Sequence, residues 1–154
     1  MHLYLVHHGE AVGPDVDIRR PLSPAGAEEV ARLAARAAAL GTRPAVVWHS
    51  GKLRAKQTAE AYWRACNALA PLSATRDLQP DAPPGWIRDR LRFEPRDILI
   101  AGHYPHLPRL LALLLGDAPG STGGFPQHGA VALRSDDDGE TWTEIWRLDP
   151  GETA

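Results

Sequence analysis

Three short apolar runs, each ending abruptly in polar residues, constrain the fold of this chain more than any other feature. Their lengths and their valine and isoleucine content are typical of buried strands, and they cover residues 3–6, 45–48 and 97–101. A helical pattern follows each run, at residues 25–40, 52–69 and 107–115. Regular alternation of strands and helices predicts a three-layer α/β sandwich, in which helices flank a mostly parallel central sheet.

The remaining segments complete a single expected domain over residues 1–154, with no internal repeat and no linker. A short helical piece is expected around residues 87–91, and a Gly/Pro-rich loop at 117–129. Residues 130–134 and 142–146 alternate between polar and apolar side chains and are joined by an aspartate-rich turn. This pattern predicts a C-terminal hairpin.

Composition and charge exclude several classes of protein. Hydrophobic residues make up 44% of the chain and charged residues 23%, as in folded globular proteins. The formal net charge of -2 argues against a nucleic-acid-binding surface. The longest apolar cluster, residues 110–115, is too short to span a membrane. No signal peptide is recognisable. The one cysteine, Cys66, fits a reducing compartment. We therefore expect a cytoplasmic monomer that binds neither nucleic acid nor membranes.

The polar residues at the three strand exits carry the chemistry. His7 and His8 end the first run, Arg54 lies one turn into the helix after the second run, and His103 ends the third. Because ligands bind at the carboxyl edge of a parallel sheet, we expect these side chains to converge there, beside helix N-termini that favour an anion. An arginine among histidines suits a phosphoryl group. One histidine can attack phosphorus while another stabilises charge on the oxygens.

These residues lie in three segments, 6–10, 50–58 and 101–105, that resemble the sequence blocks of the histidine phosphatase superfamily, also called phosphoglycerate mutase-like. The first block of that family is an Arg-His-Gly motif, and the second has a serine, three variable residues, Arg-Ala and then Gln-Thr. Residues 20–23 and 103–108 resemble its SixA-type branch, the bacterial phosphohistidine phosphatases. The resemblance covers almost the whole chain and implies the phosphoglycerate mutase-like fold and a phosphatase that works through a phosphohistidine.

The resemblance implies a role for each matching residue. His8 would be the nucleophile that becomes phosphorylated, Arg54 would clamp the phosphoryl oxygens, and His103 would contact the phosphate and stabilise the transition state. Gly9 would allow close approach of the backbone. The residues expected to bind substrate are His7, Gly9, Arg20 and Tyr104.

His7 departs from the family, whose motif has an arginine at this position. Arginine supplies a fixed charge and two parallel donors, whereas imidazole donates through one nitrogen at a time and is charged only when protonated. A bound anion would favour the protonated form and give partial rescue. A lost charge-assisted hydrogen bond costs roughly 1.5–3 kcal/mol, or about one to two powers of ten in rate. The substitution therefore predicts a weakened or retuned enzyme, in which restoring the arginine raises turnover.

The sequence offers no clear acid to protonate a leaving group. The two candidate general acids are Asp81, in a proline-rich loop, and Glu10, two residues after the expected nucleophile. An alkoxide leaving group needs such an acid, whereas the imidazole of a phosphohistidine can leave already protonated. A protein that carries phosphohistidine therefore fits as the substrate, and a small phosphorylated metabolite is the other expected partner.

Two alternatives remain open at this point. A phosphate-binding regulatory module would keep the pocket but have weak or no turnover because of His7. A metal-dependent hydrolase would use His7, His8, His103 and His106 as ligands. Arg54 would repel a cation, however, and we expect neither a metal nor a cofactor. His128 could reach the pocket from the loop before residue 130, with no role assigned to it.

Overall fold

The computed structural model describes residues 1–117 and 124–151, so part of the expected loop at 117–129 lies outside the described residues. A six-stranded mixed sheet lies at its centre, in the order β3-β2-β4-β1-β5-β6. The strands are β1 (His2–His7), β2 (Val46–His49), β3 (Leu72–Ala74), β4 (Ile98–Gly102), β5 (Ala130–Arg134) and β6 (Thr143–Leu148). Among these described strands only β5 runs against the others, since it is antiparallel to both β1 and β6.

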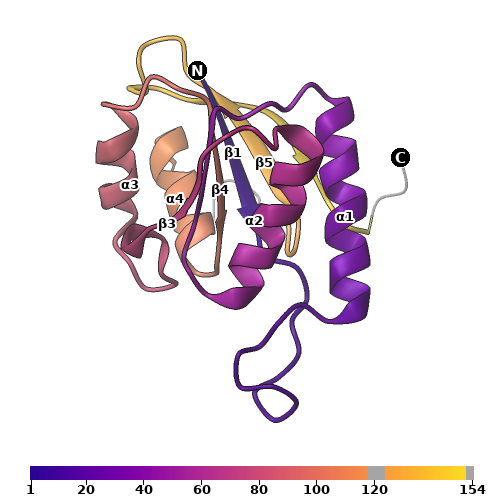
Figure 1. Ribbon diagram of the computed structural model, residues 1–154. Coiled ribbons are helices and arrows are strands. Elements are labelled where there is room, and N and C mark those ends of the chain that lie inside the picture. The colour runs from indigo at the N-terminus through magenta and orange to yellow at the C-terminus, as the bar shows by residue number, and fades with distance from the viewer. Residues whose placement is uncertain (118–123, 152–154) are drawn as a thin grey trace.

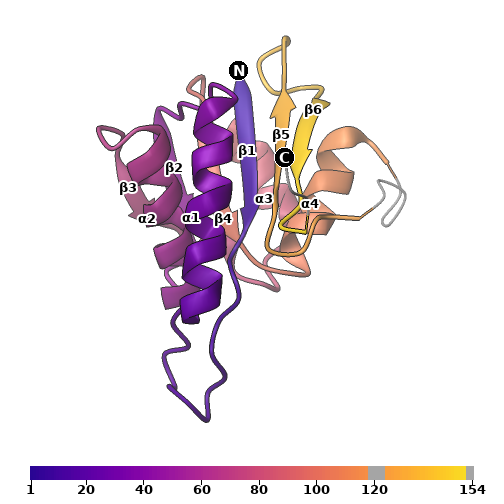
Figure 2. The same cartoon turned by 90° about the vertical axis from the view of Figure 1, so that its right-hand side faces the viewer.

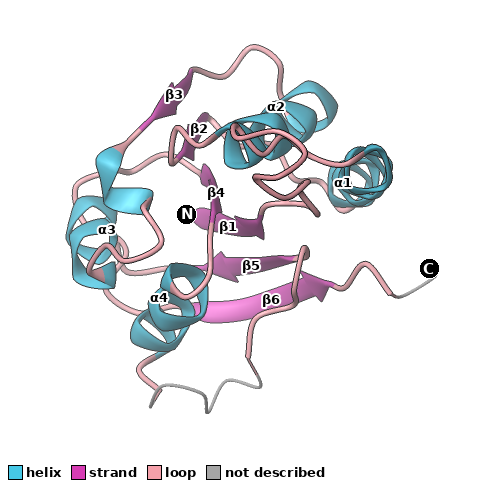
Figure 3. Cartoon of the chain, turned by 90° about the horizontal axis from the view of Figure 1, so that it is seen from below, coloured by secondary structure: helices cyan, strands magenta, loops and turns pink. Residues whose placement is uncertain are grey.

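Two pairs of helices cover the two faces of this sheet (Figure 3). The helices are α1 (Pro24–Ala39), α2 (Leu53–Cys66), α3 (Pro84–Leu91) and α4 (His106–Leu115), and a 3-10 helix, η1, spans Arg76–Leu78. α1 packs against α2 on one face, and α3 packs against α4 on the other. The predicted three-layer α/β architecture with a terminal hairpin is therefore confirmed. No helix in the described part of the chain combines the length and the apolar character that crossing a membrane requires.

Side chains of β1 alternate between the two layers. Leu3 and Leu5 belong to the core cluster that includes residues of α3 and α4, whereas Tyr4 and Val6 pack with residues of α1 and α2. All four side chains are buried. A strand covered on both faces has no polar side, which explains why this stretch of sequence is continuously apolar rather than alternating.

Some element boundaries differ from those expected. β3 has two exposed residues and one half-buried one, so this edge strand carries no apolar run that the sequence pattern could reveal. α2 ends at Cys66 rather than at residue 69, because the backbone of Asn67 leaves the helical region, with φ of -166°. The second hairpin strand begins and ends slightly later than expected, at Thr143–Leu148.

The start of α1 packs directly on the chain that leaves β1. Ser23 caps the helix by accepting a hydrogen bond from the Gly26 amide on its Oγ (3.0 Å). A Cβ atom on Gly26 would lie 2.2 Å from the carbonyl oxygen of Glu10, and one on Gly9 would lie 2.4 Å from Cγ2 of Val30. Packing between the β1 exit and α1 therefore requires glycine at both positions. Gly9 thus allows the chain that leaves β1 to approach α1 closely.

The segment between β1 and α1 extends beyond the carboxyl end of β1 (Figures 1 and 2). Its two arms are joined where the Val12 amide donates to the carbonyl of Pro21 (3.0 Å), and Arg20 Nε donates to the carbonyl of Val12 (3.0 Å). The Leu22 amide donates to Oε1 of Gln57 on α2 (2.8 Å). These bonds hold Arg20 at the base of the segment, next to the carboxyl edge of the sheet.

Candidate active site

At its carboxyl end, the chain of β1 is hydrogen-bonded on both sides. The amide of His7 donates to the carbonyl of Gly129 (2.9 Å), and the amide of His8 donates to the carbonyl of Gly102 (3.1 Å). This brings His8 beside His103, with ring centroids 5.1 Å apart, and His7 beside His8, with ring centroids 4.4 Å apart. The predicted convergence of the histidines from the first and third strand exits is therefore seen.

The hydrogen bonding of His8 defines which of its ring nitrogens carries the hydrogen. Its Nδ1 lies 2.7 Å from the carbonyl oxygen of Gly9. Because a carbonyl can only accept, Nδ1 carries the hydrogen, which leaves a lone pair on Nε2. Burial, with a smaller contribution from the positive charge of Arg54, lowers the pKa of His8 to about 4, although the Gly9 hydrogen bond acts in the opposite direction. The imidazole is therefore uncharged at neutral pH.

His103 lies on the other side of His8 and is anchored by Ser50. Its Nε2 is 2.6 Å from Oγ of Ser50, and this hydroxyl also accepts a hydrogen bond from the amide of Lys52 (3.3 Å). Nδ1 of His103 is buried and has no hydrogen-bond partner. Burial, followed by the neighbouring His8 and Arg54, lowers the pKa of His103 to about 3.

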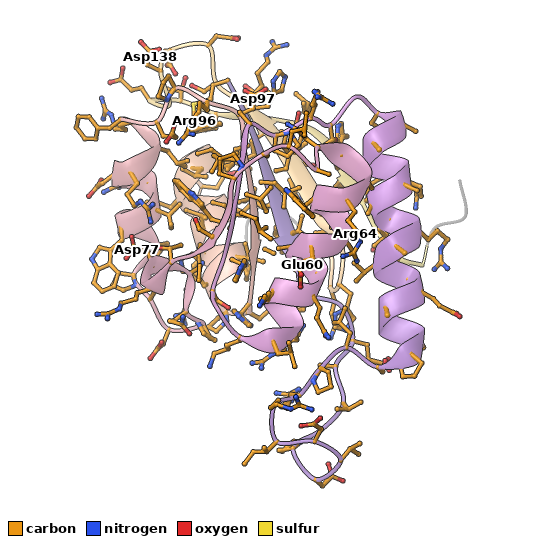
Figure 4. The ribbon with its side chains drawn as sticks, viewed as in Figure 1. Glu60, Arg64, Asp77, Arg96, Asp97 and Asp138 are labelled. Carbon is orange, nitrogen blue, oxygen red and sulfur yellow. The ribbon has the colours of Figure 1, made fainter. Side chains whose placement is uncertain are left out.

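Two arginines, Arg20 and Arg54, lie near the histidines. Arg54 is in the first turn of α2, its Nε has no hydrogen-bond partner, and burial and then Arg20 lower its pKa. Both arginines act on the pKa of His8. None of the ion pairs in the described part of the chain involves either arginine. Asp97 and Asp138 lie at the opposite end of the molecule from the segment between β1 and α1 (Figure 4). The carboxyl edge of β1 therefore favours an anion.

Thr58 joins β1 to α2 and was not assigned a role from the sequence. Its side chain is buried. Its Oγ1 accepts a hydrogen bond from the Gly9 amide (3.1 Å) and donates one to the carbonyl of Arg54 (2.8 Å). The residue after His8 and the turn that carries Arg54 thus share one hydroxyl. The only sequence signal for Thr58 was the Gln-Thr pair of the second block. Its other member, Gln57, accepts a hydrogen bond from the Leu22 amide and so holds the segment that contains Arg20.

His7 is enclosed between two aromatic rings. Tyr104 stacks on one side, with ring centroids 4.3 Å apart and 12° between the planes, and His128 stacks with a centroid distance of 4.9 Å and 6°. Nδ1 of His7 accepts a hydrogen bond from the backbone amide of His128 (2.7 Å). Burial, followed by the neighbouring His8, lowers the pKa of His7 to about 2. Burial and these neighbours oppose the protonation of His7, by which a bound anion was expected to compensate in part for the missing arginine.

The two acids considered from the sequence have different surroundings. Asp81 is exposed, in the turn between η1 and α3, and no hydrogen bond or ion pair among the described residues connects it with the histidines. Oε1 of Glu10 accepts a hydrogen bond from Oγ of Ser23 (2.9 Å), at the start of α1. Neither carboxylate has a contact that would mark it as a general acid.

The histidine cluster differs from the metal site considered as an alternative. His7, His8 and His128 each offer a ring nitrogen within 4.8 Å of those of the other two. His106 instead lies buried in the first turn of α4, and neither of its ring nitrogens has a partner. The acceptor role of Nδ1 leaves the hydrogen of neutral His7 on Nε2, where it blocks metal binding, and Arg54 and Arg20 add positive charge nearby. The cluster suits an anion better than a cation.

Solved structures of phosphatases resemble this chain over almost its full length. The protein histidine phosphatase SixA, complexed with tungstate, has 25% sequence identity, a TM-score of 0.84 and 97% coverage of each chain. A protein proposed to be the phosphohistidine phosphatase SixA of Agrobacterium tumefaciens has 24% identity, a TM-score of 0.79 and 97% coverage of each chain. The alpha-ribazole phosphatase of Shigella flexneri has 18% identity and a TM-score of 0.74, with 100% of this chain and 99% of that chain covered.

No protein-family model and no curated protein sequence matches the chain. The structural matches nevertheless confirm the predicted resemblance to the histidine phosphatase superfamily and to its SixA-type branch. They also confirm that the fold is the phosphoglycerate mutase-like one.

Proposed function

We propose that this protein is a phosphatase that hydrolyses a phosphohistidine or a small phosphomonoester through a covalent phosphohistidine at His8. The observation that carries the proposal is the hydrogen bond from Nδ1 of His8 to the Gly9 carbonyl, because it leaves a lone pair on Nε2. That lone pair belongs to a neutral ring with His103 beside it and Arg54 close enough to lower its pKa. An uncharged imidazole among unpaired cations is suited to attack a phosphate group.

In the first step, Nε2 of His8 attacks phosphorus and forms an N–P bond while the bond from phosphorus to the leaving group breaks. Arg54 holds the phosphoryl oxygens, and His103 stabilises the charge that develops on them. When the leaving group is the imidazole of another phosphohistidine, that ring departs already protonated. No residue of this chain then has to act as the acid, in agreement with the surroundings of Asp81 and Glu10.

In the second step, water attacks the phosphorus atom of phosphorylated His8. The P–O bond forms as the N–P bond breaks, inorganic phosphate is released, and His8 returns to the neutral form with its hydrogen on Nδ1. The Gly9 carbonyl that accepts this hydrogen (2.7 Å) keeps the ring in the same orientation through both steps.

Trapping the intermediate tests this proposal. Rapid acid-free quenching of the enzyme with a radiolabelled aryl phosphate, followed by peptide mapping, is expected to place the label on His8. His8→Asn should give no labelled peptide yet still bind inorganic phosphate in calorimetry. A label on another residue would contradict the mechanism, and full turnover by His8→Asn would contradict the covalent route. Excess chelator should leave turnover unchanged.

A regulatory phosphate-binding module is the second candidate, because one observation favours it: the neutral His7 occupies the position of the family's arginine. This candidate predicts phosphate binding that requires Arg54 but no labelled peptide and no release of phosphate. A phosphohistidine peptide and an aryl phosphate should both be assayed, so that an inactive result does not depend on the choice of leaving group.

A further inference from the structure

We propose that His7 donates a hydrogen bond from Nε2 to the transferred phosphoryl group as a permanently neutral ring, and that His128 is the positioning residue that fixes it in this form. The inference rests on the proposed function, since it assumes that a phosphoryl group is bound beside His8. It assigns a role to the residue that replaces the family's arginine. It also gives a role to His128, to which the sequence assigned none.

The tautomer follows from the hydrogen bond between the two residues. The backbone amide of His128 is a donor only, and it lies 2.7 Å from Nδ1 of His7. Nδ1 must therefore carry a lone pair, and the hydrogen of the neutral ring is on Nε2. Protonation of Nδ1 would place two hydrogens against each other and break this bond. Nε2 of His7 therefore carries a hydrogen. Nε2 of His8 carries a lone pair instead, because Nδ1 of His8 donates to the Gly9 carbonyl.

A rigid turn holds the amide of His128 in place. His128 has a left-handed backbone, with φ of 59°, which is uncommon for a residue other than glycine. The next residue, Gly129, donates its amide to the carbonyl of Pro126 (2.9 Å) and accepts a hydrogen bond from the amide of His7. A Cβ atom on Gly129 would lie only 2.2 Å from the carbonyl oxygen of Leu148. The turn is therefore bonded to both the backbone and the ring of His7.

The same turn also reaches the nucleophile. Nδ1 of His128 donates to the carbonyl oxygen of His8 (2.7 Å). Tyr104, on the other face of His7, donates its hydroxyl to the carbonyl of Phe125. Because stacked rings lie on both faces of His7, rotation of the ring to the opposite orientation is hindered. The hydroxyl of Tyr104 thus supports the turn, and the expected role of Tyr104 in substrate binding stays a prediction.

The groups around His7 oppose its protonation. Burial is the largest cause that lowers the pKa of His7, followed by His8, His128, His103 and Arg54. The phenol of Tyr104 lies against its ring. No carboxylate in the described part of the chain forms an ion pair or hydrogen bond with His7. Unlike an arginine, His7 supplies a donor without a charge, so we expect it to hold inorganic phosphate more weakly and to release the product more easily.

The tautomer can be measured directly, without an assay of activity. Nitrogen-15 NMR of histidine-labelled protein is expected to show His7 with hydrogen on Nε2 only, and His8 with hydrogen on Nδ1 only. Addition of inorganic phosphate should shift the Nε2–H signal of His7. His128→Gly keeps the backbone donor and tolerates the left-handed conformation, so it should preserve the tautomer of His7. A hydrogen on Nδ1 of His7, or titration of its ring near pH 6.5, would overturn the proposal.

Variants at His7 test the donor role separately. His7→Gln retains a neutral donor and should keep kcat/KM within about tenfold, whereas His7→Leu removes the donor and should lower kcat/KM about ten- to a hundredfold. His7→Arg should tighten inhibition by inorganic phosphate. Equal activity of His7→Leu and the wild type would exclude the donor role. An inactive wild type whose His7 signal still shifts with phosphate would instead exclude the proposed phosphatase function.

Discussion

At the scale of single residues, His7 and His8 are adjacent in the chain but have opposite hydrogen-bonding states. A carbonyl oxygen fixes the ring of His8 with its lone pair on Nε2, and an amide fixes the ring of His7 with its hydrogen there. Both assignments follow from partners that cannot change their roles, since a carbonyl only accepts and a backbone amide only donates. Under the proposed mechanism, Nε2 of His8 can therefore attack phosphorus, whereas Nε2 of His7 can only donate a hydrogen bond.

Arg54 should contribute more to catalysis than any other cation of α2. Removing its charge in Arg54→Met is expected to lower kcat about 10²–10³-fold, as for the loss of a donor that stabilises transition-state charge. Arg64→Met is the matched control, because Arg64 is exposed in the last turn of the same helix (Figure 4). Steady-state kinetics of both variants measure the effect, and similar kcat values would show that Arg54 does not contact the phosphoryl group.

At the scale of elements, the site depends on how β1 is joined to α2. Thr58 connects the residue after His8 to the first turn of the helix through two hydrogen bonds. Gly9 and Gly26 let the start of α1 approach the same stretch of chain. Three elements thus meet within a few residues of His8, and none of them can shift without moving the others.

Thr58→Val should destabilise the protein by about 1–3 kcal/mol, because it leaves the buried amide of Gly9 without an acceptor. Thr42→Val provides the comparison, since the hydroxyl of Thr42 is buried and already lacks a partner. That variant should be neutral or stabilising. Urea denaturation of both proteins measures the free energies of unfolding. An equal loss of stability in the two variants would show that the Gly9 hydrogen bond contributes nothing.

At the scale of the whole molecule, buried neutral histidines make stability depend on pH. Burial is the largest cause that lowers the pKa of His7 to about 2, of His103 to about 3, and of His8 and His106 to about 4. In the unfolded chain each histidine titrates near 6.5. Below that pH the unfolded state binds more protons than the folded state, so protonation favours unfolding.

The free energy of unfolding should therefore decrease as the pH is lowered from about 6.5 to about 5, before most carboxylates titrate. His106→Leu should make this decrease shallower and raise stability at pH 5, because it removes a buried ring whose nitrogens have no partners. Denaturant titrations across this range measure the slope. The same slope in His106→Leu and the wild type would show that His106 is not buried in its neutral form.

Sequence patterns predicted those parts of the molecule that depend on burial and strand order. The apolar runs at β1, β2 and β4 predicted the parallel core, and their polar exits predicted which histidines would meet. β3 was missed because Leu72–Ala74 has no buried face to leave a pattern. His128 was not assigned a role because that role depends on a backbone amide and a positive φ. Neither feature can be deduced from the type of side chain. The bond between Thr58 and Gly9 depends equally on tertiary geometry.

The hydrogen bonds that extend β1 to both sides at His7 and His8 have a kinetic consequence. His7 ends β1, which lies between β4 and β5 in the sheet, and His8 follows it directly, so exchange of these amides with deuterium should require opening of the sheet rather than local fraying. The backbone at His7 and His8 is then expected to stay in place when a ligand binds. Under the proposed function, the substrate would have to bring its phosphoryl group to this fixed backbone, so a bulky substrate should associate more slowly than a small one.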